Sequence, residues 1–253
     1  MIIIGAGRVG GALASAAIEH GVRTTLVDRA SGWQALQTGS GPILVTTRND
    51  DLPEIVGRVP SHRHADLVFV QNGMLRDWLR EAGLSNCTRG LLFFAVAERG
   101  APIEAGESSP FTGRHAAALV EFLTRLQVPA RVVQPREFAL VELEKLAWNT
   151  AFGLLCERFD VAVGAVVEQH SDLMNELLEE LVTVGEVALQ LRLTEPERRQ
   201  LLQGIVNYSR SIPGYRGAVK EWRWRNGWFV ESALTLGITT PVHHALLSAT
   251  GHG

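Results

Sequence analysis

Two polar residues in the stretch LVELEKLAWNTAFGLLC, residues 140–156, have types and a spacing that could serve catalysis. Lys145 and Asn149 are four residues apart, so on a helix they lie on one face, one turn from each other. The stretch is otherwise rich in leucine, alanine and aromatic residues, which indicates a largely buried helix. A buried ammonium needs a partner or a task, because uncompensated burial is costly. The alternative is that Lys145 extends to the surface and Asn149 caps a loop.

Three further polar residues weaken that alternative. Asn72 follows an apolar run, in the sequence QNGM. Ser209 lies in the sequence YSRS, and Glu221 opens EWRWRNGWF, which also contains an Asn-Gly pair. A few polar groups of these kinds, converging on one pocket, fix the orientation of a small substrate.

A glycine motif near the N-terminus predicts a nucleotide site. GAGRVG places Gly5, Gly7 and Gly10 in a G-x-G-x-x-G pattern, after the apolar run III and before a small-residue helix. In that context the glycines allow a tight turn, close approach of a pyrophosphate and close packing of helix on strand. Arg8 and Val9 complete the loop at the helix N-terminus, where N–H groups favour phosphates. A glycine-rich turn without a ligand is the alternative.

The end of the next predicted strand bears on the choice of cofactor. Asp28 stands 18 positions after Gly10 (28 − 10), where a carboxylate would accept hydrogen bonds from the adenosine ribose of NAD. Arg29 follows directly and could pair with the 2′-phosphate of NADP. The two residues point to different cofactors, and a solvated pair at a strand end is a third interpretation.

The elements that must position these residues change character along the chain. Up to about residue 135, strand-like and helix-like segments alternate, which predicts a Rossmann-type α/β fold with a doubly wound parallel sheet. We therefore predict a dinucleotide-binding domain over residues 1–135. Its strands are predicted at 2–5, 23–29, 42–48, 65–73, 90–100 and 130–135.

The strand pattern stops after residue 135. A second, all-helical C-terminal domain is therefore predicted over residues 136–253, with Thr194 capping one of its helices. Its helices are predicted at 137–156, 171–191, 195–211 and 216–236.

Composition narrows the class of protein. The 253 residues are 46% hydrophobic and 20% charged, with a formal net charge of -3 and no basic groove, so nucleic acid is a poor candidate partner. Cys87 and Cys156 lack metal-ligand spacing and predict a reducing compartment. No apolar run reaches about 18 residues and no signal peptide is recognised, so neither a membrane span nor export is expected. We expect a cytoplasmic protein without a bound metal.

Two clusters near the C-terminus are interpreted structurally. Trp224 and Trp228 would share one helix face, which favours packing over stacking on nucleic-acid bases. His243 and His244 have no metal-ligand partners at suitable spacing and are predicted to be surface residues of the last helix.

The order of these motifs resembles that of the ketopantoate reductases (2-dehydropantoate 2-reductases) over nearly the whole chain. The motifs are GxGxxG, the strand ends VTTR and QNG, KLxxN in the Lys145 helix, and a serine followed at a fixed distance by a glutamate and an Asn-Gly pair. Ser209 and Glu221 meet that distance (221 − 209 = 12), with Asn226 and Gly227 following. The ordered set is more specific than any one member.

The resemblance implies an NAD(P)H-dependent reductase of a small 2-keto acid, as in pantothenate biosynthesis. Lys145 would donate a proton to the ketone oxygen, and Glu221 would bind the hydroxyl and help to place Lys145. Asn72 and Asn149 would hold the substrate near the nicotinamide, and Ser209 would bind its carboxylate. The physical chemistry agrees, because a developing alkoxide is stabilised by a nearby cation or acid.

The resemblance also implies a cofactor site. The family places a phosphate-binding arginine at the position of Arg29, which slightly favours NADP, while Asp28 keeps NAD as the alternative. The predicted cofactor-binding residues are Gly5, Gly7, Arg8, Val9, Gly10, Asp28, Arg29, Arg48 and Asn72.

The sequence departs from the family in several places, including the residues just before Glu221, which lack the family's usual pattern. Gly153 stands where the family often has a second asparagine, Arg48 replaces a lysine, and the segment between Arg29 and Pro42 is shorter. Gly153 predicts a roomier pocket and therefore a keto acid bulkier than ketopantoate.

Two other functions remain open at the level of sequence. One is a related β-hydroxyacid or imine-reducing dehydrogenase, and the other is a dinucleotide-binding protein without catalysis. The spacing of Ser209 and Glu221 favours the keto-acid reductase, whereas Gly153 and the short segment after Arg29 favour the non-catalytic protein. A homodimer is one arrangement that the sequence allows.

Overall fold

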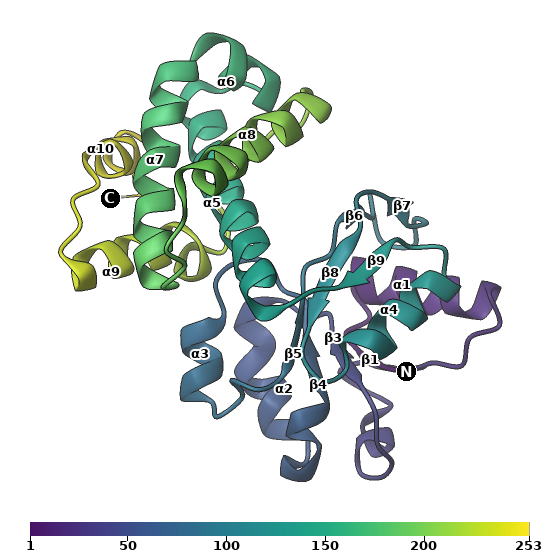
Figure 1. The fold of residues 1–253 in the computed structure, drawn as a ribbon. Coiled ribbons are helices and arrows are strands. Elements are labelled where there is room, and N and C mark those ends of the chain that lie inside the picture. The colour runs from purple at the N-terminus through teal and green to yellow at the C-terminus, as the bar shows by residue number, and fades with distance from the viewer. Residues whose placement is uncertain (253) are drawn as a thin grey trace. The chain divides into compact units, whose positions relative to one another are not determined.

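The computed structural model describes residues 1–252 and divides the chain into two compact units (Figure 1). The first unit is Met1–Phe138, and the second begins at Ala139. The boundary between them lies inside a long helix, α5 (Pro135–Phe159).

The first unit is built on one mixed sheet. Its strand order is β2-β1-β3-β4-β5-β8-β9, and every neighbouring pair is parallel except β5 and β8. The predicted doubly wound α/β fold is confirmed. The strands are β1 Ile2–Ile4, β2 Thr25–Val27, β3 Ile43–Val45, β4 Leu67–Phe69, β5 Thr88–Gly90, β8 Ser109–Thr112 and β9 Ala130–Val132.

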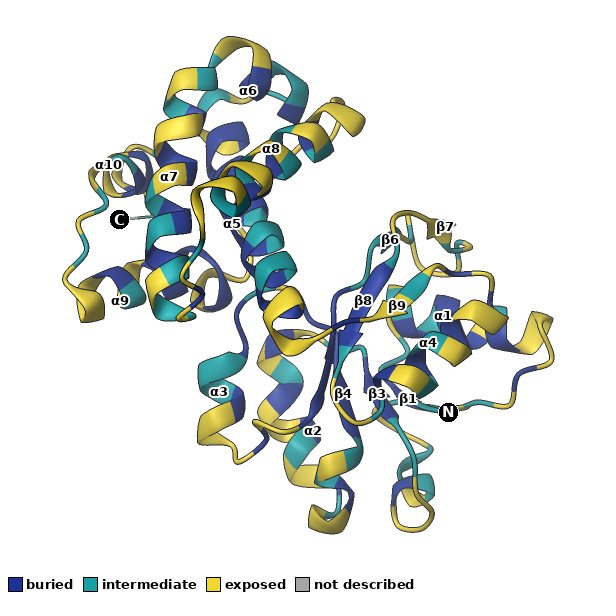
Figure 2. Cartoon of the chain, in the orientation of Figure 1, coloured by how far each residue is buried: buried dark blue, intermediate teal, exposed yellow. Residues whose placement is uncertain are grey.

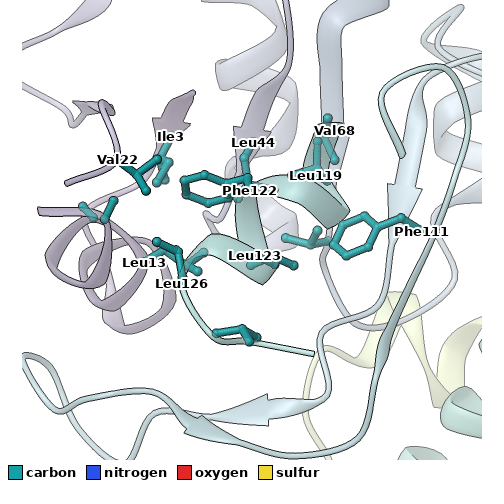
Figure 3. Packing of buried hydrophobic residues seen from close by; sticks show 14 of the residues in the cluster. Ile3, Leu13, Val22, Leu44, Val68, Phe111, Leu119, Phe122, Leu123 and Leu126 are labelled. Carbon is teal, nitrogen blue, oxygen red and sulfur yellow. The ribbon is translucent and has the colours of Figure 1, made fainter. Parts of the chain in front are cut away.

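Helices cover both faces of this sheet because its apolar strands have two buried sides. On one face, α1 (Arg8–Glu19) and α4 (Ala116–Arg125) pack their leucines and phenylalanines on β1, β3 and β4 (Figure 3). On the other face lie α2 (Leu52–Arg58) and α3 (Arg76–Glu81) (Figure 1). β3 and β4 are accordingly buried along their whole length (Figure 2).

The predicted strand at 90–100 is wrong. β5 ends at Gly90, where the ring of Phe111 occupies the space that a side chain would need. The chain then leaves the sheet and forms a separate hairpin, with β6 (Phe94–Ala95) antiparallel to β7 (Glu104–Ala105). The apolar run from Leu91 to Phe94 contains no glycine or proline to mark this exit, so it looks like a continuing strand.

Helices make up the second unit, and no strand occurs among its described residues. This confirms the predicted all-helical region after the sheet. After α5, its elements are α6 Val163–Gln169, α7 Ser171–Ala188, α8 Glu195–Ser211, the 3-10 turn η4 Trp222–Trp224, α9 Asn226–Leu236 and α10 Pro241–Ala249. None of the described helices is both long enough and apolar enough to cross a membrane.

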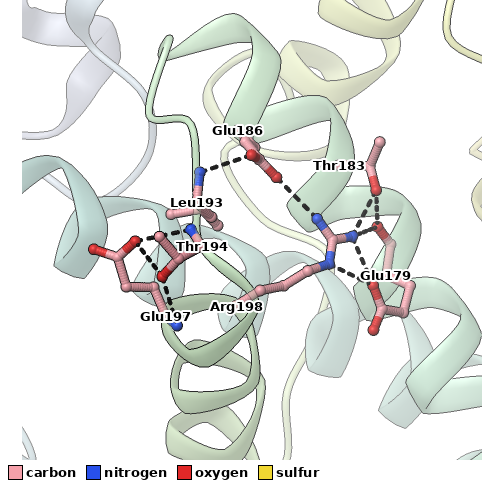
Figure 4. Close-up of polar contacts among 7 residues, drawn as sticks. All are labelled: Glu179, Thr183, Glu186, Leu193, Thr194, Glu197 and Arg198. Atoms are coloured by element: carbon pink, nitrogen blue, oxygen red, sulfur yellow. Dashed lines mark hydrogen bonds and ion pairs between the residues drawn. The ribbon is translucent and has the colours of Figure 1, made fainter.

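Polar contacts join α7 to the start of α8 (Figure 4). Arg198 donates hydrogen bonds to Glu179 Oε2 at 2.6 Å and to Glu186 Oε2 at 2.9 Å. Thr194 caps α8, as predicted, and forms a reciprocal capping box with Glu197. Such a box satisfies N–H groups that would otherwise lack partners at a helix start.

The predicted helix at 216–236 is wrong over its first ten residues. Residues 215–220 form no regular element, η4 follows, and α9 starts only at Asn226. Gly217 allows this segment to approach α5 closely, since a Cβ there would lie 2.6 Å from the carbonyl oxygen of Phe152. The backbone of this segment therefore packs directly against α5.

His243 is also placed differently from its prediction as a surface residue. It is 1% exposed, and its Nε2 lies 2.9 Å from Asn226 Oδ1. The first turn of α10 is anchored from α7, because Glu180 accepts the backbone N–H groups of Val242 and His243 at 2.9 Å. His244 is exposed, as predicted.

The tryptophan pair is buried, in keeping with its interpretation as packing residues. Trp224 and Trp228 are 4% and 7% exposed, respectively. They belong to η4 and α9, so the predicted single helix face does not exist.

Candidate functional site

The glycine loop between β1 and α1 has the backbone shape of a phosphate cradle. Gly5 has φ of +111°, a conformation that only glycine adopts at little cost, and its N–H donates to Val27 O at 2.8 Å. At Gly10 any Cβ would collide with the Gly5 carbonyl, so the glycine lets α1 begin close to the strand. Thr46 Oγ1 braces the turn, 2.9 Å from Ile4 O and 3.0 Å from Gly5 O.

Space and donors are present at Gly7, the N-cap of α1. A Cβ added there would meet nothing within 4 Å. No side chain among the described residues caps this helix start. The first N–H groups of α1, from Arg8 and Val9 onward, therefore suit an anion such as a phosphate. The residues fit the pyrophosphate of a dinucleotide.

The β6–β7 hairpin reaches back to this loop, a contact that the sequence did not reveal. Arg99 Nη2 donates to Ala6 O at 3.0 Å. In the opposite direction, Arg8 Nη1 lies 3.4 Å from Ala97 O. These bonds join segments 93 and 89 residues apart in the chain, so no local pattern could have predicted them.

Asp28 lies at the end of β2, but one of its oxygens already has partners. Its Oδ1 accepts hydrogen bonds from Ser31 N at 2.7 Å, Ala30 N at 2.9 Å and Ser31 Oγ at 3.0 Å. These bonds hold the pKa of the Asp28 carboxyl below its usual value, the Ser31 N–H contributing most. Asp28 therefore shapes the turn after β2, and Arg29 beside it is exposed.

The short segment after Arg29 is ordered by a buried arginine. Arg63 is 2% exposed and donates to Thr38 O and Gly41 O, both at 3.0 Å. Its charge is balanced by Asp66, whose Oδ2 lies 2.7 Å from Arg63 Nε. Sequence reasoning missed Arg63, since its backbone acceptors lie more than 20 positions away.

Asn72 follows β4 and is exposed, and its backbone oxygen accepts a hydrogen bond from Asn49 Nδ2 at 2.8 Å. The buried Gln71 before it donates to Val45 O at 2.9 Å and so ties this strand exit to β3. Arg48, at the end of β3, is exposed. The two strand ends that carry Arg48 and Asn72 are thus neighbours in the first unit.

Lys145 and Asn149 lie one turn apart on α5, and both are partly buried. The Asn149 side chain turns toward its own helix, where Nδ2 donates to the Lys145 backbone oxygen at 2.7 Å. This bond uses one amide N–H and leaves the Asn149 Oδ1 as an acceptor.

Ser209 is fully buried beside the same helix. Its Oγ donates to Ile205 O at 2.8 Å and accepts from Trp148 Nε1 at 3.0 Å. Trp148 also stacks on Phe152, with ring centroids 5.7 Å apart, and meets the edge of Tyr208 at 5.0 Å. The predicted serine is therefore connected, through Trp148, to the helix that carries Lys145 and Asn149.

Gly153 does not enlarge a pocket, and that expectation is wrong. A Cβ at this position would lie 2.8 Å from the carbonyl oxygen of Ala218. The glycine makes room for the backbone of Ala218 and Val219, which fills the space that a side chain would occupy.

Glu221 stands at the end of that segment in a left-handed conformation, with φ of +50°. Its Oε2 lies 2.6 Å from Nη2 of Arg225, which is only 8% exposed. The buried Nε of Arg225 has no hydrogen-bond partner among the described residues. Arg225 was not predicted, although its spacing of four from Glu221 was a readable signal.

The candidate residues thus fall into two groups. The first unit carries the glycine loop, Asp28 and the strand ends, and the second carries Lys145, Asn149, Ser209 and Glu221. Among the described residues there is no cluster of histidine, cysteine and acidic side chains suited to a metal ion. The roles of these residues stay predictions.

Comparisons with known proteins bear on the family. Residues 137–252 match the family model described as Ketopantoate reductase PanE/ApbA C terminal. That stretch contains all four predicted site residues of the second unit. The resemblance to the ketopantoate reductases is confirmed.

Solved structures match over nearly the full length. A 2-dehydropantoate 2-reductase from Methylococcus capsulatus has a TM-score of 0.77 at 14% identity, covering 99% of this chain and 95% of that chain. A PanE/ApbA family ketopantoate reductase from Ralstonia eutropha JMP134 has a TM-score of 0.75 at 18% identity, covering 99% and 97%. A D-mandelate dehydrogenase in complex with NADH has the same TM-score at 16% identity, also covering 99% and 97%.

These likenesses establish the ketopantoate reductase fold, while the sequence identities are low. A comparison with curated proteins finds no match.

Proposed function

We propose that the chain is an NAD(P)H-dependent reductase of a small 2-keto acid, of ketopantoate reductase type. The observation that carries the proposal is the match of residues 137–252 to the ketopantoate reductase C-terminal model. The matched range contains the four predicted site residues of the second unit, in the order that the resemblance implies: Lys145, Asn149, Ser209 and Glu221. The glycine loop of the first unit adds a phosphate cradle.

When bound, a nicotinamide cofactor would supply the hydride that the carbonyl carbon of the keto acid needs. Lys145 gives a proton from its ammonium group to the carbonyl oxygen, and the product is a 2-hydroxy acid. A positively charged donor stabilises the negative charge that develops on that oxygen. Glu221 binds the hydroxyl and holds Lys145 in place, and Arg225 orients the Glu221 carboxylate through Nη2, 2.6 Å from Oε2.

Asn72, Asn149 and Ser209 are the proposed substrate ligands. Asn149 offers its Oδ1 and its second amide N–H, since only one N–H is used within the helix. Ser209 binds a carboxylate when its hydroxyl proton turns from Ile205 O to the ligand. Its Oγ can keep accepting from Trp148 during this change, because a hydroxyl has two acceptor lone pairs.

The proposed cofactor is NADP, with NAD as the alternative. The turn of Asp28 toward Ser31 supports NADP, because it gives the carboxylate a task other than binding ribose. Arg29 is the proposed ligand of the 2′-phosphate. Arg29→Ala should weaken NADPH binding by roughly tenfold and leave NADH binding nearly unchanged. Equal NADPH affinity of the variant and the wild type, measured by fluorescence titration, removes Arg29 from this role.

The function itself is tested by following NADPH and NADH oxidation at 340 nm with a panel of 2-keto acids that includes ketopantoate. Turnover with one of them supports the proposal. Dinucleotide binding without turnover on any of them favours the second candidate, a non-catalytic dinucleotide-binding protein. The observation in favour of that candidate is the burial of Ser209, whose hydroxyl has partners within the fold.

The assembly and the compartment are proposed by analogy. One solved neighbour, covered to 99% and with a TM-score of 0.74, is described as a dimeric ketopantoate reductase from Staphylococcus aureus. We propose a cytoplasmic homodimer for this chain. Light scattering on the purified protein checks the assembly, and a mass of one chain of 27.6 kDa contradicts it.

A further inference from the structure

We propose that residues 96–103, which we name the strap, bind the pyrophosphate of the dinucleotide through Arg99, together with Arg8 of the glycine loop. The inference rests on the proposed function only in needing a dinucleotide at this loop. The glycine motif by itself offers backbone N–H groups to the phosphates. The strap would add a side-chain ligand from a segment that is remote in sequence.

The strap is joined to the glycine loop by bonds in both directions. Arg99 Nη2 donates to Ala6 O at 3.0 Å, and Arg8 Nη1 lies 3.4 Å from Ala97 O. Each segment therefore offers an arginine to the other's backbone. The Arg99 guanidinium thus lies at the backbone of Ala6, the residue before Gly7, and Arg8 is the residue after Gly7. A Cβ added at Gly7 itself would meet nothing within 4 Å.

Both arginines have N–H groups beyond those used in these two contacts. Arg8 and Arg99 are exposed, and within the described residues neither forms an ion pair. A guanidinium has five N–H donors, and the contacts seen here go to neutral carbonyl oxygens. A phosphate oxygen is a stronger acceptor for such a group than a carbonyl, because the bond is charge-assisted.

The charges also match the ligand. A pyrophosphate diester carries one negative charge on each phosphate, and the strap and the loop supply one arginine each. The helix start of α1 adds N–H groups and the positive end of a helix dipole. The cradle thus offers full charges where the glycine motif alone supplies partial ones.

The base of the strap is fixed while its tip is exposed. Phe94 pairs with Ala105 and Ala95 with Glu104, which holds the two ends of the segment together. At the tip, Gly100 has φ of +89°, a turn conformation that lets the chain reverse directly after Arg99. The pairing of β6 with β7, labelled in Figure 1, therefore fixes both ends of the strap that carries Arg99.

The test is the binding of NADPH, NADH and ADP-ribose to the wild type, to Arg99→Gln and to Arg99→Lys, by calorimetry. Arg99→Gln should weaken all three ligands by roughly tenfold or more, because all contain the pyrophosphate. Arg99→Lys, which keeps the charge, should recover part of the loss. The salt dependence of binding should be less steep for Arg99→Gln, since one ionic contact is lost. Arg125→Gln, at an exposed arginine in the last turn of α4, is the matched control and should bind as the wild type does.

Unchanged affinity of Arg99→Gln for all three ligands overturns the proposal. So does a loss that Arg99→Lys shares in full and that comes with a lowered melting temperature, since Arg99 would then only brace the loop. Different results would contradict the proposed function and the proposed role of the strap. A wild type that binds dinucleotides without turnover contradicts the reductase but not the strap, whereas a catalytically active Arg99→Gln with unchanged affinity contradicts only the strap.

Discussion

The carboxylate of Asp28 shows at the scale of one residue how a binding motif can also build structure. One oxygen accepts three hydrogen bonds from Ala30 and Ser31, and the Asp28 backbone oxygen accepts Trp33 Nε1 at 2.6 Å. The sequence places an acid at the right distance from the glycine loop, but it does not show that this acid folds back on its own turn.

Asp28→Asn should separate these two tasks. Asparagine keeps an acceptor for the turn and removes the negative charge. The variant should therefore keep nearly the wild-type melting temperature and shift the ratio of affinities toward NADPH by several-fold, because repulsion of the 2′-phosphate is relieved. Fluorescence titration with both cofactors measures the ratio. A shift toward NADH instead would show that Asp28 does not repel a bound 2′-phosphate.

His243 predicts a pH dependence of stability. Burial lowers its pKa from 6.5 to about 4, with a smaller contribution from the neighbouring His244. The contact of Glu180 with His243 is to the backbone: the Glu180 carboxylate accepts a hydrogen bond from the His243 backbone N–H. His243 is thus neutral in the folded chain, whereas the unfolded chain binds a proton there below about pH 6.5. Its contribution is complete above that pH and is lost progressively as the pH falls toward 4.

Between about pH 7.5 and pH 5, this residue should lower the free energy of unfolding by about 2 kcal/mol. Urea denaturation of the wild type and of His243→Gln at both pH values measures the difference. The variant should lose less stability on acidification, and His62→Gln, at an exposed histidine of the first unit, should behave like the wild type. An identical pH dependence for His243→Gln and the wild type contradicts this account.

At the scale of elements, the segment 217–221 is the least predictable part of the second unit. Its course depends on two glycines, Gly153 and Gly217, that allow backbone to approach α5 from a distant part of the chain. A glycine within a helical pattern does not reveal what will pack against it. The same segment delivers Glu221 to its bond with Arg225, so local sequence could not place the predicted acid.

Gly153→Ala should destabilise the second unit by about 1–3 kcal/mol, although alanine is the better helix former. The added Cβ would lie 2.8 Å from Ala218 O, and the segment around Ala218 would have to move. Gly57→Ala is the control, because a Cβ at this position in α2 meets nothing within 4 Å and should stabilise by up to about 1 kcal/mol. Thermal unfolding compares the two, and equal stabilisation by both changes would show that the contact at Gly153 is not limiting.

Whether an element exists was easier to predict than where it ends. A short β-branched run forms the strand Ile2–Ile4, and a capping box starts α8. Both elements therefore have causes in the local sequence. At Gly90, where β5 ends, the space of a side chain is taken by Phe111 of the adjacent strand β8, a residue remote in sequence. The antiparallel β8 was missed because its short sequence SPFT carries no clear strand pattern.

At the scale of the whole molecule, the proposed chemistry draws on both units. The first offers the phosphate cradle at Gly5, Gly7 and Gly10, and the second carries Lys145 and its proposed partners. The chemistry of the predicted residues could be inferred from their types and order. Arg99 belongs to a contact between remote segments that only the folded chain creates, whereas the spacing of Arg225 from Glu221 could be read from the sequence.

The kcat of Lys145→Ala, with a keto acid that the wild type reduces, tests the central claim most directly. The account predicts a fall of roughly 10²–10⁴-fold with little change in cofactor affinity, because a general acid acts in the transition state. Lys145→Arg should not restore the rate, since a guanidinium does not give up its proton at working pH. Lys220→Ala, at the exposed lysine of the same unit, is the matched control. A Lys145→Ala variant that keeps the wild-type kcat would contradict the account.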